Sequence, residues 1–578
     1  MQHTSNGDIA RILRGVAEYL TMESANPFRI RAYGRAAEAI ESLEEDIFLI
    51  YKNGGEKALE AVPGVGMAIR DHVIEIFRTG KLGEYERLKK KTPVRLDELT
   101  KIEGLGPKSV KKLYEKLGVR NIKDLERAVR KGLVQEIPGF GEKTEKRILR
   151  SLEFSKKTSG RILLDKASAI AQSIKKRIGG IEGVSLCEVA GSFRRRKETI
   201  GDLDLLVVAK NPARIMDSFV RMEGVGRVLA HGKTKSSITL KSGLDVDLRI
   251  VPKESCGAAL NYFTGSKEHN IALREIAIKK GLKLNEYGLF KGEKVIAGKN
   301  EEKLYEALGL EYVPPELREN TGEIEASMRR KGSRLPKLIG YDTLKGDLQV
   351  QTEWSDGVAS IEEMAREALR RGLSYIAITD HTKRLTIANG LNEKRLTLQA
   401  KEIDRANIAL KGKITILKGT ECDILKDGSL DLSDKVLAKL DVVGASVHSY
   451  FNLERKAQTE RIIKAMENPN VDIIFHPTGR LIGRRDAYAI DIDAIIKAAK
   501  RTGTILEIDA FPDRLDLCDE YIKKCVVSGV KLAIDSDAHA PEHFSVLEFG
   551  LAQARRGWAT KGDVINTRNL FDLKKLLK

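Results

Sequence analysis

The sequence has 578 residues, of which 42% are hydrophobic and 32% charged, so it is neither a membrane-spanning nor a disordered protein, and it is too long for one hydrophobic core. It contains no apolar run of about 18 residues, no secretory signal and no CxxC spacing among its five cysteines, and we expect a cytoplasmic protein with reduced thiols. The net charge is +18, and residues 81–160 hold 22 Lys/Arg against 12 Asp/Glu, which favours a nucleic-acid partner.

The first 160 residues repeat a hydrophobic-x-Gly-hydrophobic-Gly phrase three times, at 62–66, 102–106 and 137–141. Helical apolar spacing surrounds each phrase, which therefore resembles the helix-hairpin-helix motif. Glycine lets the backbone approach a phosphate, and the next helix offers it free N–H groups. One such phrase is more often an ordinary turn, but three in a basic stretch favour DNA binding. The predicted DNA-binding residues are Gly64, Gly66, Gly104, Gly106, Gly139 and Gly141.

Residues 187–208 read CEVAGSFRRRKETIGDLDLLVV, an apolar strand, a basic glycine turn and an Asp-x-Asp strand. Alternation puts Asp202 and Asp204 on one face, which is costly without a cation between them. A later alternating strand, residues 243–251, can bring Asp247 as a third carboxylate. This set suits two Mg²⁺ ions in phosphoryl transfer. The competing interpretation, the exposed face of an edge strand, fits a lone Asp-x-Asp better than this combination.

The turn before the Asp-x-Asp strand carries the donors that a triphosphate needs. Glycine backbone N–H groups, a hydroxyl and guanidinium groups can surround phosphate oxygens. The residues concerned are Gly191, Ser192, Arg194, Arg195 and Gly201.

The strings GSFRRRKETIGDLD, VDLRIVPK, YFTGS and LNEYGLF, between about Arg161 and Arg318, resemble the family X DNA polymerases. The resemblance implies that Asp202 and Asp204 bind both ions, and that Asp247 completes the triad and deprotonates the primer 3′ hydroxyl. It implies further contacts to the incoming nucleotide: Arg161, Ser192, Arg195 and Gly201 to phosphates, Tyr262, Phe263 and Gly265 to the sugar, and Asn270 and Arg274 to the nascent pair and template.

Two positions depart from the vertebrate member of that family, DNA polymerase beta. Asp245 stands where that enzyme has an arginine beside the third carboxylate. His72 stands where the family's lyase lysine would follow the first hairpin. Because that lysine is the Schiff-base nucleophile, deoxyribose-phosphate lyase activity is left open by the sequence.

After residue 336 seven apolar runs end in polar residues, a pattern typical of buried parallel strands with functional groups at their C-terminal ends. One histidine after a strand is more often structural than a ligand, but several converge here. With three carboxylates they form a set suited to Mn²⁺ or Zn²⁺. The predicted metal ligands of this region are Asp356, His381, Glu421, His448, His476, Asp537 and His539.

The strings ITDH, KGTECDIL, ASVHS, HPTGRLIGRR and IDSDAH resemble the PHP domain fused to bacterial and archaeal family X polymerases. That domain usually opens with His-x-His, whose imidazoles hold one of up to three ions, whereas this sequence has Gln349 and Gln351. An amide is a poor replacement for imidazole at a transition metal. The segment 507–512 also differs from the Asn-rich family version. The barrel is therefore either a nuclease with a reduced centre or a structural partner.

Together these patterns predict a multidomain chain of α+β and α/β parts. The expected order is an N-terminal helical lyase-like domain with the first hairpin (1–90), a fingers-type domain with two hairpins (91–160), a nucleotidyltransferase palm (161–255), a thumb-like α+β domain (256–318), a polar linker (319–336) and a PHP barrel of seven distorted β/α units (337–578).

The leading hypothesis is a Mg²⁺-dependent, template-directed DNA polymerase for short gaps in base-excision repair. Its PHP domain would act as a 3′–5′ exonuclease or abasic-site endonuclease. The expected partners are gapped or primer–template DNA and dNTPs, with no membrane and a monomeric chain. Two alternatives remain: a PHP phosphoesterase whose N-terminal half only delivers DNA, and a DNA scaffold without catalysis.

Overall fold

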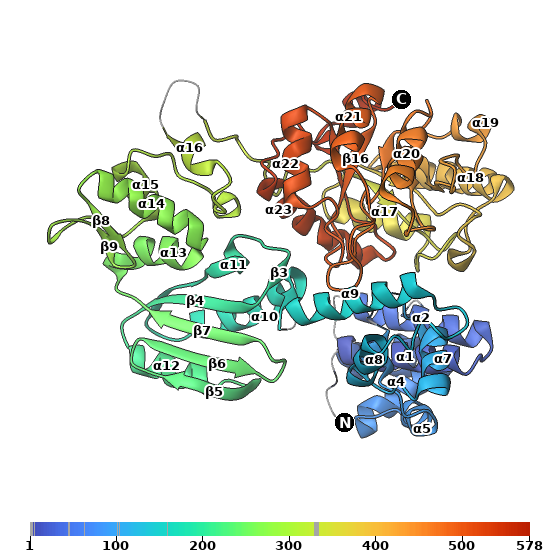
Figure 1. Ribbon diagram of the computed structural model, residues 1–578, viewed down its shortest axis with the longest axis horizontal. Coiled ribbons are helices and arrows are strands. Elements are labelled where there is room, and N and C mark those ends of the chain that lie inside the picture. The colour runs from blue at the N-terminus through green and yellow to red at the C-terminus, as the bar shows by residue number, and fades with distance from the viewer. Residues whose placement is uncertain are drawn as a thin grey trace.

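The N-terminal region is helical in the computed structural model, which describes residues 4, 6–43, 47–62, 64–100, 102, 104–158, 160–328 and 334–578 (Figure 1). Its helices are α1 (Asn6–Met22), α2 (Pro27–Ser42), α3 (Ile47–Glu60), α4 (Met67–Thr79), α5 (Gly83–Lys91), α6 (Leu96–Leu99), α7 (Pro107–Leu117), α8 (Ile122–Arg130) and α9 (Glu142–Thr158). Their apolar faces form one continuous core from Ile9 to Leu152. The domains expected at 1–90 and 91–160 therefore share a core, and the Tyr19 hydroxyl donates a hydrogen bond to Val94 O across them at 2.6 Å.

The palm region is a five-stranded sheet of order β2-β4-β7-β6-β5. Its elements are β1 (Ile162–Leu163), α10 (Leu164–Gly179), β2 (Val184–Val189), α11 (Gly191–Arg194), β3 (Thr199–Ile200), β4 (Asp202–Ala209), α12 (Pro212–Val220), β5 (Val225–His231), β6 (Lys235–Leu240) and β7 (Asp245–Ile250). Neighbours β4 and β7 run parallel, and apolar residues such as Leu205 and Leu248 bury one face of the sheet. The opposite face is left to polar side chains.

The thumb region packs helices on a small antiparallel sheet of order β10-β9-β8. Its elements are η1 (Lys253–Ser255), α13 (Cys256–Thr264), α14 (Lys267–Lys279), β8 (Lys283–Asn285), β9 (Gly288–Lys291), β10 (Lys294–Ala297), α15 (Glu301–Ala307), η2 (Pro315–Leu317) and α16 (Glu323–Ser327). Helix α16 falls in the segment expected to be a polar linker. Its Ile324 joins the thumb core and its Glu323 is fully buried against His269 at 2.7 Å. The first part of that segment therefore belongs to the thumb, and residues 329–333 lie outside the described residues.

The C-terminal region is a parallel barrel with strands in sequence order from β11 to β17, which confirms the predicted fold. The strands are β11 (Gly346–Val350), β12 (Tyr375–Ile378), β13 (Thr415–Asp423), β14 (Val442–Ser446), β15 (Ile473–Ile474), β16 (Ile505–Asp509) and β17 (Leu532–Asp535). A parallel bridge between Val350 and Ala538 brings the first strand next to the last. The surrounding helices are α17 (Ile361–Arg370), η3 (Thr386–Ala388), α18 (Glu393–Ala409), α19 (Asp434–Leu437), α20 (Arg455–Met466), α21 (Ile492–Thr502), α22 (Asp519–Ser528), η4 (Pro541–Val546), α23 (Leu547–Arg556), η5 (Ile565–Thr567) and α24 (Leu570–Lys574).

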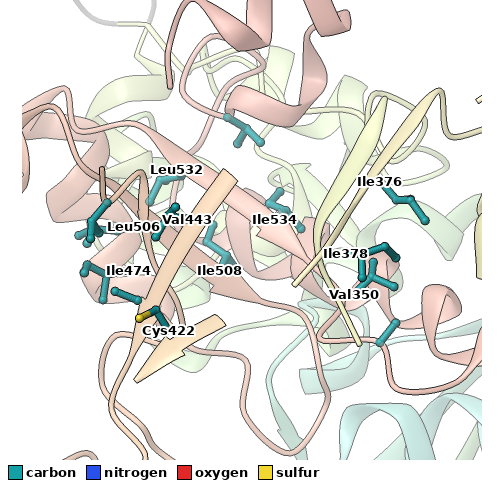
Figure 2. Close-up of a cluster of buried hydrophobic side chains, with 14 of the residues drawn as sticks. Val350, Ile376, Ile378, Cys422, Val443, Ile474, Leu506, Ile508, Leu532 and Ile534 are labelled. Carbon is teal, nitrogen blue, oxygen red and sulfur yellow. The ribbon is translucent and has the colours of Figure 1, made fainter. Parts of the chain in front are cut away.

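Alternation along the barrel strands separates an apolar outer layer from the barrel interior, which is apolar at the start of the strands, around Tyr375 and Ile505, and polar at their C-terminal ends. Figure 2 shows the buried apolar side chains of this layer, among them Leu506 and Ile508 of β16 and Ile534 of β17. Since successive side chains of a strand point to opposite faces, Glu507 and Asp509 point away from that layer. The same rule turns Gln349 of β11 inward, because its neighbour Val350 belongs to the apolar layer. Strand geometry thus gathers polar groups inside the barrel at the C-terminal ends of the strands.

Candidate active sites

The three predicted aspartates of the palm lie on paired positions of neighbouring strands. In the β4–β7 register Asp202 is opposite Asp245 and Asp204 is opposite Asp247, so these carboxylates share one face of the sheet. Burial, and then the charges of Asp202 and Asp247, raise the pKa of Asp204 to about 6. Like charges so arranged are stabilised by a divalent cation, and the donor set fits Mg²⁺, which prefers oxygen ligands.

Two further contacts in this site were not predicted from the sequence. The Lys235 ammonium lies 2.9 Å from Asp247 Oδ2, so a side chain of β6 neutralises part of the acidic face. The Thr239 hydroxyl donates to Asp245 Oδ1 at 2.6 Å. Both partners lie on β6, the strand next to β7. Thr239 is opposite Asp245 in the sheet register, whereas Lys235 is opposite Arg249 and reaches Asp247 diagonally.

The glycine turn predicted to hold phosphates wraps closely around Asp204. Gly191 has φ +63°, and a Cβ there would lie 2.4 Å from Asp204 Oδ2. The Ser192 hydroxyl is buried and has no hydrogen-bond partner among the described residues. Arg161 donates to Thr199 O at 2.5 Å, and its Nη1 would lie 2.8 Å from a Cβ on Gly201. The structure thus brings four of the predicted phosphate-binding residues together beside the aspartates.

The predicted nucleotide residues of the thumb form a connected group. Tyr262 and Phe263 pack edge to face with ring centroids 5.1 Å apart, and the Asn270 amide donates to Tyr262 O at 2.7 Å. The Arg274 Nε donates to Asn270 O at 3.3 Å. The guanidinium of Arg249, next to the aspartates on β7, stacks 4.5 Å from the Phe263 ring and joins this group to the palm.

The three hairpins have the same local geometry. Their first glycines, Gly64, Gly104 and Gly139, have φ of +77°, +81° and +94°, a region that favours glycine. Gly66 and Gly106 directly precede α4 and α7, and no side chain caps either helix. The first N–H groups of these helices are thus left for a ligand such as a phosphate. These glycines lie in the helical region, apart from the palm aspartates.

Glu421 of β13 is the centre of the barrel's polar cluster. Its Oε1 lies 2.8 Å from His476 Nε2 and 3.1 Å from His448 Nε2, and its Oε2 lies 3.2 Å from His381 Nδ1. Burial alone would raise the pKa of Glu421, but the charges of His381 and His448 outweigh it and hold this pKa well below its ordinary value. Four of the predicted metal ligands, Glu421, His381, His448 and His476, therefore lie together.

A second group of ligand atoms lies beside the first. Asp356 Oδ1 is 3.6 Å from both His381 Nε2 and His539 Nε2. Ligands about 2.1 Å from a tetrahedral ion are about 3.4 Å apart, so this spacing fits an ion between them. Asp537 stands just outside, with its Oδ1 3.9 Å from His539 Nδ1.

Two groups of three donors have ligand atoms that all lie within 4.8 Å of one another: Asp356, His381 and His539, and His381, Glu421 and His448. Within the described residues no such group includes the palm aspartates. Burial would lower the pKa of His448 and His539, but nearby carboxylates outweigh it and raise both to about 9. Such clusters gain a divalent cation by releasing protons, so the barrel residues fit a metal centre.

The glutamines that replace histidines are fully buried in this cluster. Gln351 donates through Nε2 to Glu421 Oε2 at 3.0 Å, so an amide is hydrogen-bonded to one oxygen of the central carboxylate. Its Oε1 and both polar atoms of Gln349 have no hydrogen-bond partner in the part of the chain that the structure describes. The residues do not fit an imidazole-bound ion at this position.

Several residues of the barrel centre were not predicted. Asp423 Oδ1 lies 3.4 Å from His448 Nδ1, and Arg514 Nε lies 3.3 Å from Asp509 Oδ2. Burial and neighbouring carboxylates raise the pKa of Glu507 and Asp509. Strand alternation was the available signal, because Asp423 and Asp509 follow Glu421 and Glu507 by two residues.

No helix among the described residues is long and apolar enough to cross a membrane.

Four family models match the chain. They are a helix-hairpin-helix domain at residues 4–82, a SAM-like helix-hairpin-helix tandem at 96–153, the DNA polymerase beta thumb at 259–319 and the PHP domain at 347–510. The matches cover the three hairpins, the thumb and the barrel up to residue 510.

Among curated proteins, the DNA polymerase/3′-5′ exonuclease PolX of Bacillus subtilis is 39% identical over 578 residues, covering 99% of both chains. A probable phosphatase of Thermoanaerobacter sp. is 34% identical over 236 residues, which are 38% of this chain and 88% of that protein. A probable phosphatase of Syntrophotalea carbinolica is 32% identical over 203 residues, 34% of this chain and 78% of that protein.

Proposed function

The chain belongs to the family X DNA polymerases that carry a C-terminal PHP domain, and we propose that it fills short gaps in DNA and trims or incises the same DNA with its barrel. The observation that carries the polymerase function is the shared face of Asp202, Asp204 and Asp247 beside the Gly191 turn. A nucleotide triphosphate and a primer end can meet there.

The palm aspartates have two roles in nucleotidyl transfer, metal binding and proton acceptance. Asp202, Asp204 and Asp247 would hold Mg²⁺, which supplies charge for the developing negative oxygens when bound. Asp247 accepts the proton of the primer 3′ hydroxyl once Lys235 has moved away from it.

The dNTP is held by groups from two domains. Ser192 and the backbone of Gly191 and Gly201 donate to its phosphates, and Arg161 adds a guanidinium. Tyr262 and Phe263 form an aromatic wall against the sugar, fixed by the Asn270 amide and by Arg249. Asn270 and Arg274 line the same side, toward the template pair.

The barrel acts on phosphodiesters as a 3′–5′ exonuclease or abasic-site endonuclease. Its two donor groups would hold Mn²⁺ or Zn²⁺, which supplies an activated water when bound. Glu421, His448 and His476 form one wall of the centre, and Asp356 with His539 forms the other. The alternative of a purely structural barrel is less consistent with two donor groups of ligand spacing.

The hairpins and the barrel are arranged to share one DNA strand. A cavity of about 1420 Å³ is lined by Gly104 and Gly106 of the second hairpin and by Arg484 and Arg485 of the barrel. Phe451, three residues after His448, lines it as well. The lining combines basic and aromatic side chains, which suit single-stranded DNA, with the carboxylates of Asp8, Glu18 and Asp97. We assign this cavity to a strand passing from hairpin to barrel. The monomeric state and the cytoplasmic location stay predictions.

The test is a 5′-labelled primer on one-nucleotide-gapped DNA, incubated with dNTPs and Mg²⁺ or Mn²⁺. We expect wild type to extend and shorten it, Asp202→Ala to lose extension only, and His448→Ala to lose shortening only. Primer shortening by His448→Ala would contradict the assignment of nuclease activity to the barrel centre. Extension by Asp202→Ala would contradict the assignment of polymerase activity to the palm aspartates. DNA binding without extension or shortening by wild type would support the hypothesis of a DNA scaffold without catalysis.

A further inference from the structure

A barrel arginine reaches into the nucleotide-binding turn of the palm. Arg556, the last residue of α23, has a side chain only 2% exposed. Its Nη1 donates to the main-chain oxygen of Arg195 at 2.8 Å and to Glu319 Oε1 at 3.1 Å. Its Nη2 pairs with Asp519 of the barrel. Figure 1 shows α23 beside the palm elements α11 and β3. This guanidinium therefore connects the barrel directly to the turn.

The interface around this arginine is tightly packed. Leu515 and Phe549 of the barrel are buried in the core of the palm. Arg480, four residues after His476, pairs with Glu198 of the same turn at 2.7 Å and donates to Leu515 O. The turn is thus held from the barrel side at both ends.

Glu319 links Arg556 to the predicted phosphate ligand Arg195. One oxygen, Glu319 Oε1, lies 3.0 Å from Arg195 Nε, 3.1 Å from Arg556 Nη1 and 3.7 Å from Lys197 Nζ. Burial alone would raise the pKa of Glu319, but the charges of Arg556, Arg195 and Lys197 outweigh it and lower this pKa. A carboxylate surrounded by three cations competes with a phosphate for Arg195.

We propose that Arg556 is a positioning residue of the polymerase, through which the barrel sets the affinity of the palm for dNTPs. Arg556 binds the backbone of the turn. It also stays paired with Glu319 when the Arg195 side chain leaves Glu319 to bind a phosphate of the dNTP. Without Arg556, Arg195 and Lys197 are the ion-pair partners left to Glu319 among the described residues, and Glu319 binds them more strongly. The proposal rests on the proposed polymerase function, and on the resemblance of this turn to that of family X polymerases, which assigns Arg195 to the triphosphate.

The test measures steady-state extension by full-length protein with varied dNTP. For Arg556→Gln we expect the KM for dNTP to rise about tenfold, since charged hydrogen bonds are lost, while kcat changes less than about threefold. Arg556→Lys, which keeps the charge, should recover part of the loss. Adding Glu319→Gln to Arg556→Gln should return the KM close to wild type, because the competing carboxylate is gone. A merely structural role of Arg556 does not predict that rescue.

The matched control is Arg555→Gln, which removes the neighbouring interface arginine. Arg555 pairs with Glu316 at 2.7 Å and donates to Ile339 O. It approaches the turn through the Tyr341 ring, which lies 5.0 Å from Arg555 and 5.8 Å from Arg196, and not through Glu319. We expect its KM for dNTP to stay within about twofold of wild type. Primer shortening, which depends on the barrel centre, should be the same in all these variants.

Three results would overturn the proposal: an unchanged KM in Arg556→Gln, an equal rise in Arg555→Gln, or no rescue by Glu319→Gln. If Arg556→Gln does not fold, the single variant Glu319→Gln provides the test. A KM for dNTP below the wild-type value supports the proposal, and an equal or higher KM contradicts it. A wild type that does not extend the primer contradicts the proposed function instead.

Discussion

The palm site and the barrel centre bring carboxylates together in different ways. On the palm, Asp202 is exposed and Asp247 is partly neutralised by Lys235 at 2.9 Å. In the barrel, the fully buried Glu421 has three histidines within 3.2 Å. The first site is an open acidic face on a sheet. The second is an enclosed cluster in which imidazoles and carboxylates already neutralise one another.

This difference indicates when each site acquires its cations. An open face with a half-exposed lysine can take ions that arrive with a nucleotide, whereas an enclosed cluster of ligand spacing can hold ions before substrate arrives. The two sites should therefore respond differently to mutation, acid and metal.

The largest expected effect is on the open face. Asp204→Asn removes a carboxylate from the shared face, and we expect extension to fall about a thousandfold because several kcal/mol of transition-state stabilisation are lost. Primer shortening should stay unchanged. The control is Asp245→Asn, on the same face but bonded to Thr239. A parallel loss of both activities would mean that the two sites are not separate.

The second prediction concerns the contribution of a buried ion pair between thumb and palm to the stability of the fold. Glu301 lies 2.6 Å from both Arg194 and Arg318, and although burial alone would raise its pKa, these charges lower it to about 2 from 4.5. Since the folded pKa is below the unfolded one, the stabilisation is present above pH 4.5 and is lost as pH falls from 4.5 toward 2. It amounts to about 3 kcal/mol.

We therefore expect Glu301→Gln to lower the thermal midpoint at pH 7, and the difference from wild type to shrink below pH 4.5. The exposed neighbour Glu302 provides the control variant Glu302→Gln. A difference from wild type that does not depend on pH would assign the effect of Glu301 to packing.

The third prediction concerns metal in the enclosed cluster. Gln349→His with Gln351→His restores imidazoles beside Glu421, and we expect about one further Mn²⁺ or Zn²⁺ per chain. Elemental analysis of dialysed protein measures this without reference to activity, and shortening should rise about tenfold. The control Gln135→His lies in the helical region. Metal content equal to wild type would mean that the glutamines do not limit the centre.

The smallest expected effect links both sites through the hairpins. Gly139 has φ +94°, where a Cβ costs about 1–2 kcal/mol, so Gly139→Ala should weaken binding of gapped DNA several-fold. Fluorescence anisotropy measures it, and extension and shortening at low DNA should fall by the same factor. Gly118→Ala, with φ +65° at the end of α7, gives similar strain outside a hairpin. Unequal losses of the two activities would show that the hairpins serve only one site.

The sequence by itself determined the local elements of this protein. The hairpin turns follow from glycine spacing, and the barrel follows from apolar runs that end in polar residues. Asp202 and Asp204 share a face because alternation along a strand is fixed by backbone geometry. His381, Glu421, His448 and His476 converge because parallel strands end at the same rim.

Only the tertiary structure decided which distant groups meet. Arg556 contacts Arg195, Gln351 contacts Glu421, and Lys235 pairs with Asp247. The shared core of the two hairpin domains and the thumb packing of α16 are further cases. No local pattern specifies these contacts, because they depend on sheet register and domain docking, where packing over many residues selects one arrangement.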